Sequence, residues 1–167
     1  SLQLTKIALL SFVRKINAQT IHSAQIITPG TLFGPDDKSD HLIPSVIRQA
    51  MNKNKSILMN GTGDGIRNFI YIDDFSDLLL VLIENKLFYH ESIIVTSDVN
   101  LDIKTVVNHI ATEYGLDKVL WGEQKPVYEA RLPSINLLKS LHADFQTFVF
   151  RSPLNFNKLD FQGWYLR

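Results

Sequence analysis

The sequence predicts a mixed α/β protein, and three observations support this prediction. β-prone segments alternate along the chain with segments whose apolar residues recur at helical spacing. The chain has 167 residues, of which 45% are hydrophobic, so it is long enough to bury a core without a metal or disulfide. It contains no internal repeat and no low-complexity tract.

The first half of the chain is expected to contain three helices and three strands. A helix is predicted over residues 4–17, where apolar residues recur at helical spacing: Leu9, Phe12, Val13 and Ile16. Residues 21–28 are β-prone, and the glycines and prolines from 29 to 35 predict a long turn after them. A second helix is expected over 41–52, with Pro44 in its first turn, where proline is tolerated.

A glycine-rich segment then separates two predicted strands. Residues 56–59 and 67–72 are β-prone, and residues 60–65 lie between them, so we interpret the glycines as a hairpin turn. Asp74 is expected to cap the buried helix that follows.

The second half repeats the alternation of strand and helix. A strand is predicted at 93–96, and a helix over 103–114 with Asp102 as its N-cap and Gly115 as its stop. A short strand is expected at 118–121, and a short helix from Ser134 to Leu141. The aromatic-rich residues 145–167 give no clear prediction.

Composition excludes several functions. Lys and Arg number 17, Asp and Glu also number 17, and the formal net charge of zero gives no field that would attract nucleic acid or an anionic membrane. The longest apolar run, Leu78 to Ile83, is far too short to span a bilayer. The chain has no Cys, and its His residues lack paired ligand spacing, so we expect no metal site. A soluble, cytoplasmic protein is the expectation.

Two features suggest contact with phosphate. The run Gly61-Thr62-Gly63-Asp64-Gly65 has the glycines of a phosphate loop, but the residues after it are strand-like, whereas a dinucleotide loop leads into a helix. Arg67, at the entrance of the predicted strand, has the planar guanidinium that binds a diphosphate bidentately. A surface salt bridge to an acidic residue is the alternative for Arg67.

Taken in order, several motifs resemble those of the extended short-chain dehydrogenases, the NAD(P)-dependent nucleotide-sugar epimerases and dehydratases. The matching segments are Lys6 to Ala8, Pro29 to Pro35, His41 to Pro44, Gly61 to Gly63 and Arg67 to Asp74. The resemblance covers residues 1 to about 143, and within the family the pattern is most similar to that of the GDP-fucose synthases.

This resemblance implies a fold and a division of the chain. It implies a partial Rossmann-like fold, with its last strand and helices, joined to the small C-terminal α/β substrate-binding domain. Residues 1–35 would be the remnant of the dinucleotide-binding domain, and residues 36–167 mainly the substrate-binding domain. We also expect that the chain can form a homo-oligomer through the first helix. The apolar residues of this helix lack the Rossmann-domain residues that they contact in the family.

The resemblance also implies catalytic and cofactor-binding residues. Lys6 matches the Lys that holds the nicotinamide ribose and lowers the pKa of a catalytic Tyr, but Leu2 occupies the Tyr position. The segment Pro29, Gly30, Thr31 and Leu32 matches the loop under the nicotinamide. The parent enzyme would use NAD or NADP. Because the family's Gly-rich strand-turn-helix has no counterpart here, we expect neither cofactor to bind this chain alone.

The remaining implied residues would bind a nucleotide-diphosphate sugar. His41 matches a residue that acts as an acid in epimerisation, Thr31 a sugar contact and Arg67 the diphosphate clamp. Lys125 and Arg131 match further contacts to the nucleotide sugar. The chain is therefore expected to be the C-terminal part of an NAD(P)-dependent epimerase, dehydratase or reductase, inactive by itself. The alternative is a noncatalytic nucleotide-sugar-binding or subunit-interface module, which Leu2 favours.

Overall fold

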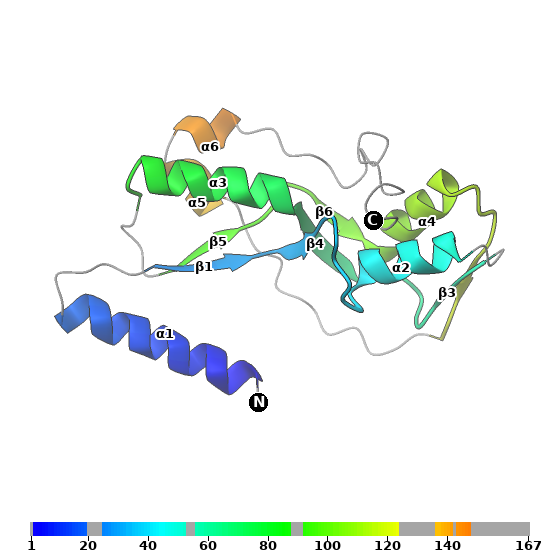
Figure 1. Ribbon diagram of the computed structural model, residues 1–167, viewed down its shortest axis with the longest axis horizontal. Helices are drawn as coiled ribbons and strands as arrows, with labels where there is room; N and C mark the ends of the chain where they lie inside the picture. Colours follow the sequence, from blue (N-terminus) through cyan, green and yellow to red (C-terminus); the bar gives the residue numbers. More distant parts are fainter. Residues whose placement is uncertain are drawn as a thin grey trace.

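The mixed α/β fold predicted from the sequence is confirmed by the computed structural model (Figure 1). The structure describes residues 2–19, 25–52, 56–87, 92–123, 136–141 and 143–147. Its helices are α1 (Leu2–Gln19), α2 (Leu42–Met51), α3 (Ile72–Glu84), α4 (Ile103–Glu113), α5 (Asn136–Leu141) and α6 (Ala143–Thr147). Its strands are β1 (Ile26–Pro29), β2 (Thr31–Phe33), β3 (Ile57–Met59), β4 (Ile66–Tyr71), β5 (Ser92–Val95), β6 (Asn100–Asp102) and β7 (Val119–Trp121).

The described strands pair in three small sheets. β1 pairs in parallel with β5, and β3 pairs in parallel with β7. β4 lies between β2, which is parallel to it, and β6, which is antiparallel. The predicted hairpin is therefore wrong, because β3 and β4 join different sheets and residues 60–65 connect them without pairing them.

Two strands were missed by the sequence analysis. β2 lies inside the predicted turn of residues 29–35, where Thr31 pairs with Phe69 of β4. β6 places Leu101 opposite Arg67. Each of these strands has three residues and depends on pairing with β4, so local sequence gives little signal for either.

The expected cap of α3 is also wrong. β4 runs directly into α3, so Tyr71 takes the N-cap position and makes no side-chain cap hydrogen bond. Asp73 and Asp74 lie in the first helical turn, where negative side chains interact favourably with the helix dipole. Asp74 is nearly fully buried there.

The predicted cap and stop of α4 are confirmed. The Asp102 carboxylate accepts hydrogen bonds from the backbone N–H and the hydroxyl of Thr105, both at 2.7 Å. These bonds favour the charged carboxylate and lower the pKa of Asp102 from its usual value. Gly115 has φ of +66°, the left-handed conformation in which glycine ends helices.

The helices cover the sheets in two groups, each with its own core. α2 and α4 pack together beside β3 and β4, and this core includes Phe33, Ile47 and Val107. Figure 1 shows α3, α5 and α6 together near β1 and β5, and their core includes Leu78 and Leu138. β4 contributes to both cores, because Phe69 belongs to the first and Ile70 to the second.

A buried amide ties β4 to the segment that follows β5. Asn68 is 5% exposed, and its nitrogen donates to the carbonyls of Ser97 (2.9 Å) and Val99 (3.2 Å) and to the side chain of Asn100 (3.1 Å). Its oxygen accepts from the Ser97 backbone N–H at 3.0 Å. A Cβ at Gly30 would lie only 2.7 Å from that oxygen, so the close approach of the β1–β2 connection to Asn68 requires glycine.

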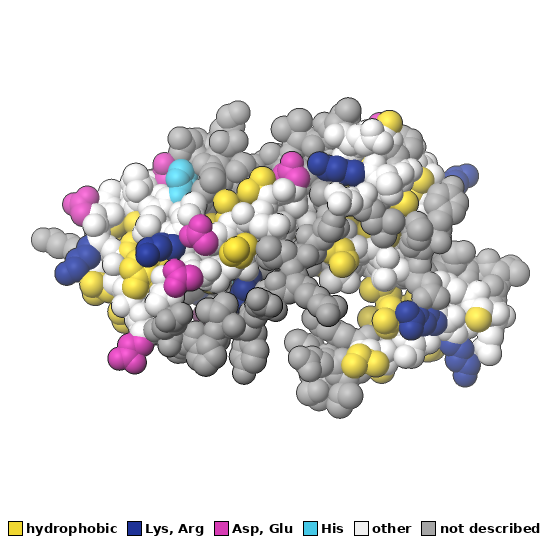
Figure 2. Space-filling model, turned by 180° about the vertical axis from the view of Figure 1, so that it is seen from behind, with side chains coloured by type: hydrophobic (Ala, Val, Ile, Leu, Met, Phe, Trp, Pro, Cys, Tyr) yellow, Lys and Arg dark blue, Asp and Glu magenta, His cyan; other side chains and the backbone are white. Residues whose placement is uncertain are grey.

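The first helix does not bury its predicted apolar stripe. Helical spacing of apolar residues predicts that this stripe packs on a sheet, but only Val13 is buried, while Leu9 is 55% exposed and Phe12 is 61% exposed, so this expectation is wrong for these two residues. Ile7 is exposed beside them. Figure 2 shows hydrophobic and basic side chains at the end of the molecule that α1 forms, at the lower right. Within the described residues, no helix combines the length and apolarity required to cross a bilayer.

Asn68→Ala should lower the free energy of unfolding by about 2–4 kcal/mol, because it leaves buried carbonyls and the Ser97 N–H without their partner. Urea denaturation measures the loss. Asn108→Ala, which removes an exposed amide from α4, is the matched control and should change stability by less than about 0.5 kcal/mol. Equal effects of the two substitutions would contradict the role of Asn68.

The Asp102 cap should make part of the stability depend on pH. Because folding lowers the pKa of Asp102, its contribution is present above the unfolded pKa and is lost as pH falls through the folded value. Asp102→Ala should cost about 1 kcal/mol at pH 7, and this difference from wild type should shrink below about pH 4. Urea denaturation at pH 7 and pH 3 measures both differences, and a constant gap would refute the electrostatic origin.

Self-association through α1 stays a prediction, and the exposed Phe12 provides its test. Light scattering over a range of concentrations should show the wild type increasing in mass, and Phe12→Lys should shift it toward the monomer. Gln19→Lys, which adds the same charge at the exposed end of this helix, is the control. A wild type that stays monomeric at high concentration would rule the prediction out.

Candidate functional site

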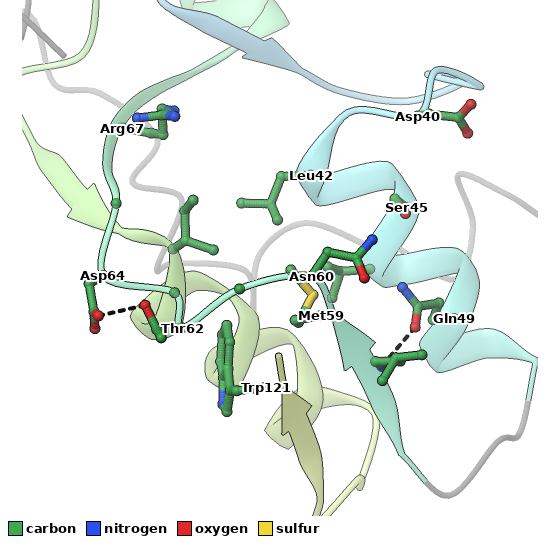
Figure 3. A pocket seen from close by; sticks show the side chains of 16 residues that line it. Asp40, Leu42, Ser45, Gln49, Met59, Asn60, Thr62, Asp64, Arg67 and Trp121 are labelled. Carbon is green, nitrogen blue, oxygen red and sulfur yellow. Dashed lines mark hydrogen bonds between the residues drawn. The ribbon is translucent and has the colours of Figure 1, made fainter. Parts of the chain in front are cut away.

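A cavity of about 470 Å³ lies between α2, the glycine-rich loop after β3, the start of β4 and the end of β7 (Figure 3). β3 and β7 are parallel, so their carboxyl ends meet at one edge of their sheet. Asn60 follows β3 at this edge, and Trp121 ends β7. Open α/β proteins commonly bind ligands at such an edge, so the cavity is our candidate binding site.

One face of α2 forms a wall of the cavity. Leu42, Ser45 and Gln49 line it, and their spacing of three and four residues places them on the same side of a helix. Val46 also lines the cavity and is fully buried, so it joins this wall to the first core. The wall therefore presents polar groups between apolar ones and is continuous with the first core.

The glycine-rich loop is held between α4 and β7. The first backbone N–H groups of α4 donate to this loop, from Ile103 to the Gly65 carbonyl (3.0 Å) and from Lys104 to the Gly63 carbonyl (2.9 Å). A Cβ at Gly63 would lie 2.5 Å from the Trp121 ring, and Gly63 has φ of +82°. The N-terminus of α4 is thus occupied by the loop, and the loop leads into a strand, so it is not a dinucleotide loop.

Arg67 lines the cavity at the start of β4 and is exposed. One guanidinium nitrogen, Nη1, donates to the Ile66 carbonyl at 2.9 Å, and the group makes no ion pair with any residue in the described part of the chain. The predicted alternative of a surface salt bridge is therefore not observed for Arg67. Its remaining N–H groups are available to an anion.

The acidic residues at the cavity have other partners. Asp40 pairs with Arg48 at 3.0 Å, and Arg48 also donates to the Ser39 carbonyl at 2.7 Å. Asp64 accepts a hydrogen bond from the Thr62 hydroxyl at 2.6 Å. Figure 3 shows Asp40 and Arg67 on opposite sides of the cavity. An anionic ligand would therefore be attracted to the Arg67 side.

The structure brings only some of the predicted site residues near this cavity. His41 is exposed at the N-cap of α2, and its neighbours Asp40 and Leu42 line the cavity. Pro29 ends β1, while Thr31 and Leu32 lie in β2, and none of these three is a lining residue.

Other predicted residues are constrained or lie outside the description. The Gly30 N–H donates to the Val95 carbonyl at 3.0 Å. Lys6 and Leu2 lie in α1, and the structure does not describe their side chains. Lys125 and Arg131 lie outside the described residues.

The described residues do not fit a dinucleotide cofactor. Its pyrophosphate needs a glycine-rich turn that leads from a strand into a free helix N-terminus, and none of the described turns has this form. Leu32, in the segment matched to the nicotinamide loop, packs against the second core. No group of three or more His, Asp or Glu side chains suitable for a metal occurs in the described ranges.

Several lining residues were missed by the sequence analysis. Gln49 and Ser45 share a helix face with Leu42, and this spacing could have revealed a polar stripe on α2. Asn60 and Trp121 come together only because β3 pairs with β7, a contact between segments about sixty residues apart. No local pattern signals that pairing.

The fold and the cavity at the ends of parallel strands define a Rossmann-like α/β protein. The chain belongs to the NAD dependent epimerase/dehydratase family, whose model matches residues 3–96. A probable GDP-L-fucose synthase 1 from Oryza sativa subsp. japonica is 26% identical over 130 residues, which are 72% of this chain and 39% of that protein. A CDP-abequose synthase from Salmonella typhimurium is 36% identical over 55 residues, covering 33% of this chain and 18% of that protein.

Solved structures show the same fold. The NAD dependent NDP-hexosamine 5,6-dehydratase TunA, involved in tunicamycin biosynthesis, has a TM-score of 0.78 at 17% identity and matches 98% of this chain and 53% of its own. A GDP-L-fucose synthetase from Naegleria fowleri bound to NADP has a TM-score of 0.72 at 17% identity, with 90% of this chain and 49% of its own matched. The chain thus spans about half of these structures and 39% of the rice relative.

Proposed function

We propose that this chain forms the nucleotide-sugar-binding part of an NAD(P)-dependent nucleotide-sugar epimerase, dehydratase or reductase. The observation that carries the proposal is the cavity at the ends of β3 and β7, with the Arg67 guanidinium, which makes no ion pair among the described residues, on its wall. Membership of the epimerase/dehydratase family gives this cavity its chemical context. The relatives are named for both GDP-linked and CDP-linked sugars, so their names leave the base open.

Arg67 would bind the diphosphate of the ligand. Its Nη1 is engaged by the Ile66 carbonyl, which holds the guanidinium against the strand entrance and leaves Nη2 and Nε for phosphate oxygens. A planar pair of donors suits a phosphate better than a single ammonium does. No acidic residue competes for this group among the described residues.

The sugar would lie toward the N-terminal end of α2. His41 is the N-cap residue there, between the lining residues Asp40 and Leu42, and we propose that it donates or accepts a proton at the sugar, as its match to the family motif implies. Thr31 is proposed as a sugar contact, and Lys125 and Arg131 as further contacts to the nucleotide sugar.

The cofactor of the whole enzyme would be NAD or NADP, which supplies hydride transfer when bound. Lys6 and the segment from Pro29 to Leu32 are proposed to lie beside its nicotinamide. The described residues form no binding site for the pyrophosphate of this cofactor. We propose that residues 1–35 lie beside the cofactor and that residues 36–167 mainly bind the substrate. The two parts share a sheet, because β1 pairs with β5.

A noncatalytic binding or interface module is the second candidate function. Leu2 favours it, because an alkyl side chain at the position of the proton-transferring Tyr neither donates nor accepts a proton. This alternative keeps the ligand and the Arg67 contact but removes the chemistry.

Arg67→Ala should weaken binding of nucleotide-diphosphate sugars by about thirtyfold, the equivalent of about 2 kcal/mol for a charge-assisted hydrogen bond. Arg67→Lys should restore only part of the affinity, because the ammonium keeps the charge without the fork. Calorimetric titration with GDP-, UDP- and dTDP-sugars measures both effects.

His41→Ala is the control for this experiment. Its proposed role belongs to proton transfer, so binding should stay nearly unchanged. Equal affinity of wild type and Arg67→Ala would show that the clamp is assigned wrongly. A wild type that binds no sugar nucleotide would remove the proposed function itself.

A further inference from the structure

Gln49 has an amide whose orientation is fixed by the backbone. Its side-chain oxygen accepts a hydrogen bond from the Leu58 N–H of β3 at 2.9 Å. A backbone N–H only donates, so the oxygen must face Leu58 and the NH₂ group must point the other way. Gln49 is half-buried and lines the cavity, and Figure 3 shows its nitrogen directed away from β3, on the side where Asn60 lies.

The neighbouring polar groups lack this constraint. The Ser45 hydroxyl can rotate to donate or to accept. The Asn60 side chain is exposed and forms no hydrogen bond in the described structure, so its amide can turn either way. Gln49 is therefore the group on this wall that presents donors in a set direction.

Gln49 also lies far from the proposed reaction centre. It follows His41 by eight residues, which is about 12 Å along an α-helix. In Figure 3, Asp40, Ser45 and Gln49 follow one another along the α2 side of the cavity, and Arg67 and Trp121 lie across from them. If the sugar lies near His41 and the diphosphate at Arg67, the base of the nucleotide falls at the Gln49 end, where the Trp121 ring offers an aromatic surface.

We propose that Gln49 is a specificity-determining residue that selects nucleotides whose base carries a keto oxygen at this position. This inference rests on the proposed function. The NH₂ group of Gln49 donates to the keto oxygen of uracil, thymine or guanine. The amino group of cytosine or adenine is itself a donor, so it leaves the two N–H groups of Gln49 unsatisfied, which opposes binding.

UDP and CDP provide the test, because they share their ribose and diphosphate and differ only at the pyrimidine edge. Calorimetric titration of the full 167-residue chain should give an affinity for UDP about tenfold higher than for CDP. Gln49→Glu keeps one oxygen for the Leu58 N–H and presents the second to the base, so the ratio should fall below one. The added negative charge weakens both ligands alike, which is why the ratio is measured.

Two further variants separate recognition from folding. Gln49→Met keeps the side-chain length without an amide and should bring the ratio close to one, which keeps the test valid if Gln49→Glu fails to fold. Gln146→Glu makes the same change of charge at an exposed position of α6 and should leave the ratio unchanged. Thermal unfolding of each variant checks its fold.

The outcomes distinguish the two proposals. A wild type that binds UDP and CDP equally, or a ratio that neither Gln49 variant changes, overturns the Gln49 assignment and leaves nucleotide binding intact. A wild type that binds neither nucleotide, nor GDP and ADP as a second pair, overturns the proposed function and this inference with it. A reversed ratio in Gln49→Glu alone, with Gln146→Glu unchanged, supports the assignment.

Discussion

The buried amide of Asn68 is the constraint on which the rest of the structure depends. β4 contributes buried residues to both cores, and Asn68 fixes it to the segment from Ser97 to Asn100 through donors and an acceptor that would otherwise be buried without partners. Arg67 is the adjacent residue on this strand. The position of the Arg67 guanidinium at the cavity therefore depends on a network of uncharged hydrogen-bonding groups next to it.

Secondary structure could be predicted from the sequence where a segment's own residues determine its structure. The helix predicted over 103–114, its Asp102 cap and its Gly115 stop depend on residues of one segment, and the structure confirms each. It could not be predicted where pairing with a distant segment determines the structure. β2 and β6 exist because β4 pairs with them, and residues 60–65 lie between two sheets instead of closing a hairpin.

The candidate site shows the same limit. Arg67 could be identified from the sequence because a guanidinium at a strand entrance has a recognisable chemistry. Gln49 and Trp121 can be identified as lining residues only from the assembled α2, β3 and β7. Gln49 is informative because the Leu58 N–H orients its amide. The family motifs indicate which enzymes share this fold, and the cavity's own polar groups suggest how this member would discriminate among ligands.

The contact between Gly63 and Trp121 has a consequence for sequence change over evolution. A side chain at position 63 would collide with the indole and would also require the left-handed φ of +82°. A descendant could acquire alanine there only after a smaller residue had replaced the tryptophan. In a descendant that changes both positions, the loss of the ring at 121 should therefore precede the gain of a methyl group at 63.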